Sequence, residues 1–240
     1  MSSRGPTFSR RWPVIDALTR FWRSDKGLSI FSALLLIVVF VLPPLLPPGA
    51  GRTVVSDVAY ALLLLTGVLA LSERGLAWRL LMSAAVVAVA VFLATWVVPV
   101  APPVIDLTSL LSLVLLLVVV LGQTFRQGPV TFHRIQGGIA AYLLLGVIWA
   151  QAFGFVEMLR PGAFSGPTDV IPGPRGWVYL SFITLTTVGY GDIVPVHPAA
   201  RSLAMLEAVT GPLYVAILLA RLVSLAVAPG ASRDLRAGPR

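Results

Sequence analysis

The sequence has no cysteine among its 240 residues, and few of its residues carry a charge. The absence of cysteine excludes disulfides and thiolate metal sites and leaves the redox compartment undetermined. Charged residues make up only 12% of the chain, against about 25% in an ordinary soluble domain. Hydrophobic residues make up 57% and come in long blocks rather than at amphipathic spacing. These observations disfavour a soluble fold and predict a membrane protein with several spans.

Six apolar segments are long enough to cross a bilayer, for which about 20 apolar residues, or a few less, suffice. Between the fifth and sixth segments, the stretch 177–186 is apolar but too short to cross, which predicts a re-entrant helix. Asp106 precedes the fourth segment and is predicted to cap its helix. The fold class we expect is an all-α membrane protein with six transmembrane helices. The predicted spans are 28–46, 54–71, 77–100, 107–122, 135–157 and 199–227.

The net charge of +8 could indicate a nucleic-acid partner, but the positions of the basic residues give another explanation. With the amino terminus inside, 14 of the 18 Lys and Arg residues lie on the inner side of the membrane. This is the bias described by the positive-inside rule. It accounts for the charge without nucleic acid and predicts a protein of the cell (inner) membrane with both termini in the cytoplasm.

The spans divide the chain into four predicted parts. Residues 1–27 form a basic leader whose apolar residues recur at near-helical spacing, typical of a helix on the inner membrane face, although a floppy basic tail is an equal alternative. Residues 28–127 hold a four-helix peripheral bundle. Residues 128–227 hold the last two spans with the short apolar stretch between them, and residues 228–240 form a short cytoplasmic tail.

The most informative stretch is residues 184–192, which read TLTTVGYGD. Gly189 and Gly191 tolerate a positive φ at little steric cost, so successive carbonyls can turn toward one axis. Val188 and Tyr190 would then point away from that axis into a packed wall. Rings of such carbonyl oxygens can replace the hydration shell of a cation.

This stretch and the segments around it resemble the pore domain of tetrameric potassium channels, in which a Thr-Val-Gly-Tyr-Gly loop forms the selectivity filter. The resemblance covers residues 135–227 as an outer helix, a pore helix, a filter and an inner helix. The whole chain resembles small bacterial six-span ion channels. The resemblance implies that Gly191 forms the outer turn of the filter and that four residues coordinate K⁺ through their carbonyls, Thr187 adding its hydroxyl. These four residues are Thr187, Val188, Gly189 and Tyr190.

One filter-like loop is one quarter of a ring, so the resemblance implies a homotetramer around a central axis. The implied function is passive, potassium-selective conduction, without enzymatic activity and without a cofactor apart from the transported ion. Potassium ions and membrane lipids are the expected partners, and no nucleic acid is. Two alternatives remain from the sequence: a subunit of a potassium transport system, and a non-conducting membrane scaffold that retains a filter-like loop.

Three further residues are expected to support the filter, namely Thr186, Asp192 and Tyr179. Tyr179 stands where many relatives have a tryptophan, and it could hydrogen-bond toward Asp192. Ile183 stands where some relatives have a glutamate that partners the filter aspartate. We therefore expect that no carboxyl pair braces this filter and that its slow inactivation differs from that of channels with such a pair.

Neither the fourth span nor the tail offers an evident gating device. The peripheral bundle 28–127 resembles a voltage-sensor domain without gating charges, because its fourth span carries no arginine. Steep voltage gating needs several charges per subunit, each supplying about 2.3 kcal/mol per 100 mV. The tail is too short for a ligand-binding domain, so we expect any gate to lie in the membrane. A hinge at the Gly-Pro pair of the sixth span and an apolar constriction below it are candidates, with a static kink and simple packing as alternatives. The candidate residues are Gly211, Pro212, Val215, Leu219 and Val223.

Two carboxylates interrupt apolar spans. Asp57 lies about one turn from the outer surface, where snorkelling explains it. Glu207 could reach Thr210 or the back of the pore helix, and we expect it to anchor the filter rather than to contact ions directly. The two histidines, His133 and His197, are predicted near opposite sides of the membrane, so they cannot form a metal cluster or a triad within one subunit.

Overall fold

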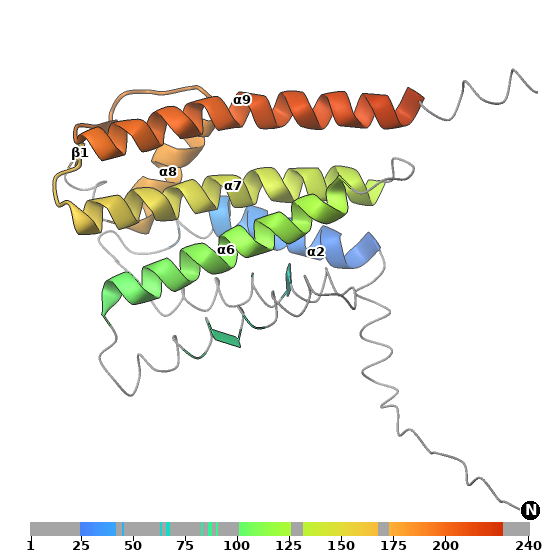
Figure 1. The fold of residues 1–240 in the computed structure, drawn as a ribbon, viewed down its shortest axis with the longest axis horizontal. Coiled ribbons are helices and arrows are strands. Elements are labelled where there is room, and N and C mark those ends of the chain that lie inside the picture. Colours follow the sequence, from blue (N-terminus) through green and yellow to red (C-terminus); the bar gives the residue numbers. More distant parts are fainter. Residues whose placement is uncertain are drawn as a thin grey trace, which may run out of the picture.

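The computed structural model is mostly helical over the part of the chain that it describes (Figure 1). Residues 1–24 of the predicted leader, the tail and Asp57 lie outside the described residues, as do the second and third spans except for a few isolated positions. The described residues are 25–41, 101–125, 132–167, 173–227 and a few positions between 45 and 90.

Three long helices coincide with the predicted fourth, fifth and sixth spans, and each is long and apolar enough to cross a membrane. They are α6 (Pro102–Thr124), α7 (Phe132–Leu159) and α9 (Pro198–Val227). The 23 residues of α6 extend over about 35 Å, which exceeds the hydrocarbon core of about 30 Å. In the first predicted span, α2 (Asp25–Leu36) continues into the π-helical turn η1 (Ile37–Val41).

Helix α6 begins earlier than the sequence indicated, so the cap predicted for Asp106 is wrong. Pro102 and Pro103 lie in the first turn of α6. Proline is tolerated there because the first N–H groups of a helix have no partner inside the helix. Asp106 is therefore the fifth residue of α6 and lies inside the helix.

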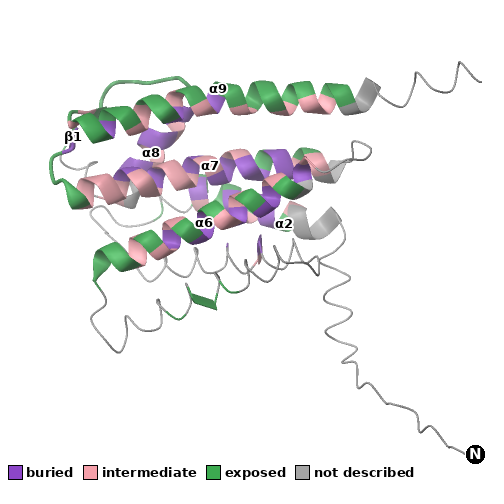
Figure 2. Cartoon of the chain, viewed as in Figure 1, coloured by how far each residue is buried: buried purple, intermediate pink, exposed green. Residues whose placement is uncertain are grey.

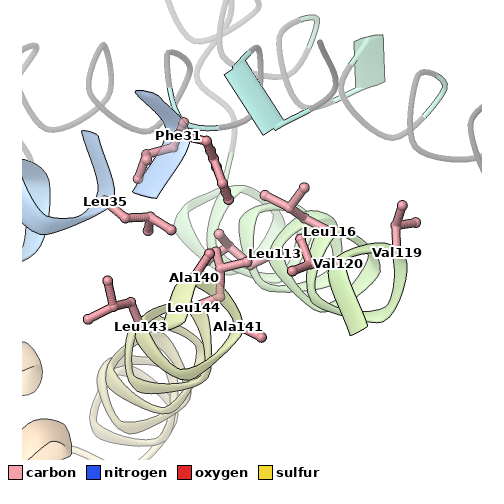
Figure 3. Packing of buried hydrophobic residues seen from close by; sticks show 11 residues of the cluster. Phe31, Leu35, Leu113, Leu116, Val119, Val120, Ala140, Ala141, Leu143 and Leu144 are labelled. Carbon is pink, nitrogen blue, oxygen red and sulfur yellow. The ribbon is translucent and has the colours of Figure 1, made fainter. Parts of the chain in front are cut away.

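Helix α7 lies at the centre of the described fold and contacts α2, α6, α8 and α9. One hydrophobic core joins α2 and α6 to the first half of α7, where Phe31, Leu113 and Leu144 are fully buried (Figure 3). This core contains residues from both sides of the predicted boundary between 127 and 128. Helices α2 and α6 of the predicted peripheral bundle therefore pack against α7 of the predicted pore domain within one chain.

A second core surrounds the short helix α8 (Pro174–Leu185). Phe164 lies between two other rings, with its centroid 5.4 Å from that of Phe153 on α7 and 5.0 Å from that of Trp177 on α8. Helix α8 has 12 residues and a length of about 18 Å, so it cannot cross a bilayer.

Two short strands connect the segment between α7 and α8 with the segment that precedes α9. Strand β1 (Phe164–Ser165) pairs antiparallel with β2 (Val194–Pro195), with Phe164 opposite Pro195 and Ser165 opposite Val194. The chain that leaves α7 and the chain that enters α9 are thereby held together.

Helix α9 is the most exposed of the three long helices (Figure 2). Only 11% of its most apolar stretch is buried within the chain, against 33% for α6 and 39% for α7. An apolar surface of this extent indicates contact with lipid or with other protein chains.

Candidate functional site

The loop that follows α8, residues 186–192, has the backbone conformation expected from its glycines. The angle φ is +53° at Gly189 and +78° at Gly191, and Thr187 has a φ of +61°. Because Val188 and Tyr190 keep negative φ values, the sign of φ alternates along the loop. Such alternation turns successive N–H groups to one side of the backbone and the carbonyls to the other.

The N–H groups of the loop point back toward the end of α8. Val188 and Gly189 both donate to the Ile183 carbonyl, at 2.8 and 3.0 Å, and Thr187 donates to the Thr184 carbonyl at 2.9 Å. These bonds use carbonyls that the carboxyl end of a helix leaves unpaired. No hydrogen bond found between described residues has a carbonyl of this loop as its acceptor. The carbonyls of this exposed loop are therefore left without a donor among the described residues.

Thr186, predicted to support the loop, is the C-cap of α8. Its N–H and its hydroxyl both donate to the Phe182 carbonyl, at 3.1 and 2.6 Å. The start of the loop is therefore fixed to the last turn of α8 by backbone and side chain together.

The hydrogen bond expected between Tyr179 and Asp192 is present at the other end of the loop. The Tyr179 hydroxyl donates to Asp192 Oδ2 at 2.7 Å, and Asp192 Oδ1 accepts from the Ile193 N–H at 3.0 Å. The Tyr179 ring stacks on the Tyr190 ring, with centroids 6.5 Å apart and planes inclined by 8°. The hydrogen bond to Asp192 raises the pKa of Tyr179 to about 12. The phenol therefore keeps its proton, and with it the bond, at neutral pH.

Glu157 and Arg201, on α7 and α9, hold the strand pair beside the loop. The Glu157 carboxylate accepts from the Gly162 N–H at 2.8 Å and from the Phe164 N–H at 3.2 Å. Arg201 Nε donates to the Pro195 carbonyl at 3.2 Å. Sequence reasoning missed the role of Glu157, although a carboxylate shortly before a Pro-Gly turn was an available signal.

Helix α9 makes direct backbone contact with the end of α8 at Gly211. A Cβ built on Gly211 would lie 2.0 Å from the Leu185 carbonyl oxygen. The Tyr142 hydroxyl of α7 reaches the same carbonyl oxygen at 3.4 Å. The residue predicted as a hinge thus has a packing reason to be glycine. Its hinge role stays a prediction, and α9 continues as a helix through Pro212.

The three residues of the predicted constriction lie on the exposed surface of α9. Val215, Leu219 and Val223 are between 50 and 61% exposed. Because they are spaced by four residues, they share one face of the helix. Their role in a gate stays a prediction.

Glu207 contacts the back of α8, one of the two positions expected from the sequence. The side chain is fully buried, and its Oε1 lies 2.5 Å from the hydroxyl of Ser181. The same hydroxyl lies 2.7 Å from the Gly146 carbonyl oxygen on α7. Sequence reasoning missed Ser181, although a serine in the middle of an apolar helix was the available signal. In the part of the chain that the structure describes, no cluster of three or more His, Asp or Glu side chains could hold a metal ion.

In a comparison with known proteins, a family model matches the region that contains α8, the loop 186–192 and α9. Residues 142–228, from within α7 to the end of α9, match a family model described as ion channel. Over 93 residues, 37% of this chain, it is 33% identical to the inward rectifier potassium channel Kirbac3.1 of Paramagnetospirillum magnetotacticum, of which the alignment covers 27%.

Two eukaryotic potassium channels are similar to this chain over stretches of about the same length. Two pore potassium channel c of Oryza sativa subsp. japonica is 36% identical over 89 residues, 36% of this chain and 17% of that protein. Potassium voltage-gated channel subfamily A member 10 of Homo sapiens is 34% identical over 100 residues, 41% of this chain and 17% of that protein. The chain thus spans about a quarter or less of the length of these relatives. No solved structure gives a significant match.

Proposed function

We propose that this chain is a subunit of a potassium-selective channel that conducts K⁺ passively across the membrane. The observation that carries the proposal is the loop 186–192, in which φ alternates in sign, the N–H groups bond to α8 and the carbonyls have no donor among the described residues. Carbonyl oxygens arranged in this way can replace the hydration shell of a cation. The similarity of residues 142–228 to ion channels, and the potassium channel relatives, support it.

In this proposal the chain assembles as a homotetramer, since each chain supplies one quarter of each carbonyl ring. A cyclic assembly of this kind closes by heterologous contacts between neighbours. Val188 and Tyr190 are 52% and 73% exposed in the single chain, although Tyr190 stacks on Tyr179. Neighbouring subunits would supply the rest of the packed wall expected around them. The large exposed apolar surface of α9 supports the same assembly.

The membrane arrangement belongs to the same proposal. Helix α8 enters the membrane from the outer side without crossing it, and its carboxyl end directs a partial negative charge toward the permeating cation. The peripheral bundle has the outline of a voltage sensor but no voltage-sensor function, and both termini are cytoplasmic.

Ion flux through liposomes that contain the purified protein tests the function directly. We expect barium-blocked K⁺ flux that exceeds Na⁺ flux by more than about tenfold, which corresponds to about 1.4 kcal/mol. The flux should need no second ion gradient and should vary little with voltage. Protein-free liposomes are the control. Flux coupled to another ion would favour a transport subunit, and no flux would favour a scaffold.

The Tyr179→Phe variant tests whether the hydrogen bond to Asp192 supports the filter. The substitution removes the hydroxyl but keeps the ring that stacks on Tyr190. We expect slow inactivation to change by about three- to tenfold, since the loss of one exposed hydrogen bond costs about 0.5–1.5 kcal/mol. Macroscopic currents measure this rate.

The Asp192→Asn variant and the double variant complete the experiment on this pair. If the two side chains act through their mutual bond, the effects of the single variants should not add in the double variant. If inactivation and selectivity are unchanged in Tyr179→Phe, Tyr179 does not support the filter.

A further inference from the structure

Three polar groups meet in the apolar region where α7, α8 and α9 pack together. They are the Gly146 carbonyl on α7, the Ser181 hydroxyl on α8 and the Glu207 carboxyl on α9. Ser181 Oγ lies 2.7 Å from the Gly146 oxygen and 2.5 Å from Glu207 Oε1. Ser181 and Glu207 both have 0% exposure. The contact is therefore complete within one chain and needs no neighbouring subunit.

The number of hydrogens available to these groups depends on the protonation state of Glu207. A serine hydroxyl carries one hydrogen, and a backbone carbonyl or an ionised carboxylate carries none. If Glu207 were ionised, the single hydrogen of Ser181 could serve only one of its two close neighbours. The other pair of oxygens would then face each other at 2.7 Å or less without a hydrogen between them. If Glu207 is protonated, each of the two contacts has its own hydrogen.

The surroundings of Glu207 favour the same protonation state. Glu207 is the tenth residue of α9, about 14 Å along the helix axis from its first residue. That depth is about half of a hydrocarbon core of about 30 Å, so the side chain cannot reach water at the surface. The other carboxyl oxygen, Oε2, is buried and has no hydrogen-bond partner among the described residues. An ionised carboxylate would place part of its charge on this unpaired oxygen, which is far more costly than burying a neutral acid.

We infer that Glu207 is a neutral carboxylic acid that donates a hydrogen bond to Ser181 Oγ, while Ser181 donates to the Gly146 carbonyl. This chain of two hydrogen bonds joins both long helices to the back of α8. Glu207 and Ser181 are positioning residues in this arrangement, since neither contacts the permeating ion.

The effect on the loop follows from the place of Ser181 on α8. Ser181 precedes Ile183 by two residues, and the Ile183 carbonyl accepts the N–H groups of both Val188 and Gly189. A shift of α8 at Ser181 would therefore move the acceptor that holds the middle of the loop. The selectivity of the loop depends on this acceptor. That part of the inference rests on the proposed function.

Infrared spectroscopy of the full-length protein tests the protonation state. We expect a carbonyl stretching band of a protonated carboxylic acid in the wild type and its loss in Glu207→Gln. The band should also change frequency in Ser181→Ala, which removes the acceptor of the carboxyl proton. A wild-type spectrum without a protonated carboxyl band would overturn the inference, and so would a band that Glu207→Gln leaves in place. This readout requires no ion conduction, so it stands or fails separately from the proposed channel function.

The positioning role is tested by comparing variants with and without a donor at position 207. The amide of Glu207→Gln can still donate to Ser181, whereas Glu207→Met has a similar volume and no donor. We expect Glu207→Met and Ser181→Ala to lower the K⁺ over Na⁺ permeability ratio in liposomes by about tenfold, because a buried hydrogen bond is lost. Glu207→Gln should retain most of the ratio. A Glu207→Met variant that conducts with the wild-type ratio would overturn this role.

Discussion

Replacing Gly211 with alanine is expected to abolish K⁺ flux and to lower the Tm of the purified protein by about 4–10 °C. The new Cβ would lie 2.0 Å from the Leu185 carbonyl oxygen, whereas ordinary contacts begin at 3.4 Å. Because both partners are main chain, no side-chain rotation can relieve the clash, and α9 has to move away from α8. Overpacking of this kind costs about 1–3 kcal/mol or more, and a tetramer would incur the cost four times.

Gly122→Ala is the matched control for this experiment. Gly122 is also a helical glycine, but it is exposed on α6, and a Cβ there would meet nothing within 4 Å. Alanine is a better helix former than glycine by about 1 kcal/mol, so the Tm should stay the same or rise slightly. Wild-type flux and Tm in Gly211→Ala would contradict the close contact. A wild-type Tm with an altered open probability would favour the hinge predicted from the sequence.

Gly189→Ala is expected to remove the selectivity for K⁺ over Na⁺ while the protein still folds. The φ of +53° at Gly189 lies in the left-handed region, which costs a residue with a Cβ about 1–2 kcal/mol. Each chain would lose only this amount, which leaves the fold in place, whereas the four loops that form one filter would together be strained by about 4–8 kcal/mol. Since Thr187 already holds a positive φ, a second strained residue adds to an existing cost. Permeability ratios in liposomes measure the effect.

D-Alanine at position 189, introduced through a synthetic segment, separates backbone strain from the added methyl group. A D-residue prefers the positive φ that an L-residue avoids. The methyl group of the L-alanine variant would itself meet nothing within 4 Å in the single chain, so strain of the backbone is the expected cause of its defect. We therefore expect the D-alanine protein to select K⁺ over Na⁺ as the wild type does. Full selectivity in the L-alanine variant would show that the positive φ is not needed for ion selection.

The loop illustrates how far a sequence can predict backbone conformation. The positive φ values expected at Gly189 and Gly191 are confirmed, because glycine is the residue that adopts them without steric cost. The positive φ of Thr187 was not predicted, because a β-branched residue avoids this region by its own preference. Hydrogen bonds from Thr187, Val188 and Gly189 to the end of α8 hold it there. Those bonds depend on the tertiary fold.

Contacts between the long helices were harder to predict than the loop. Helices α7 and α9 are apolar around most of their circumference, so hydrophobic periodicity does not indicate which face meets α8. An isolated charge in an apolar span made Glu207 conspicuous, yet its partner Ser181 depends on how α9 crosses α8. The start of α6 was predicted wrongly because the sequence offered two signals, a possible cap at Asp106 and prolines suited to a first turn.

Helix α7 touches four other helices, so a substitution along it meets a neighbour on most of its faces. At Gly146, for example, a Cβ would come within 2.5 Å of the Phe182 ring. The exposed face of α6, which includes Leu111 and Val118, meets no such restriction within the chain. Outside the loop, homologous chains should therefore vary least along α7 and more freely on that face of α6. In the proposed channel, the most conserved helix would then be the outer helix α7 and not the inner helix α9.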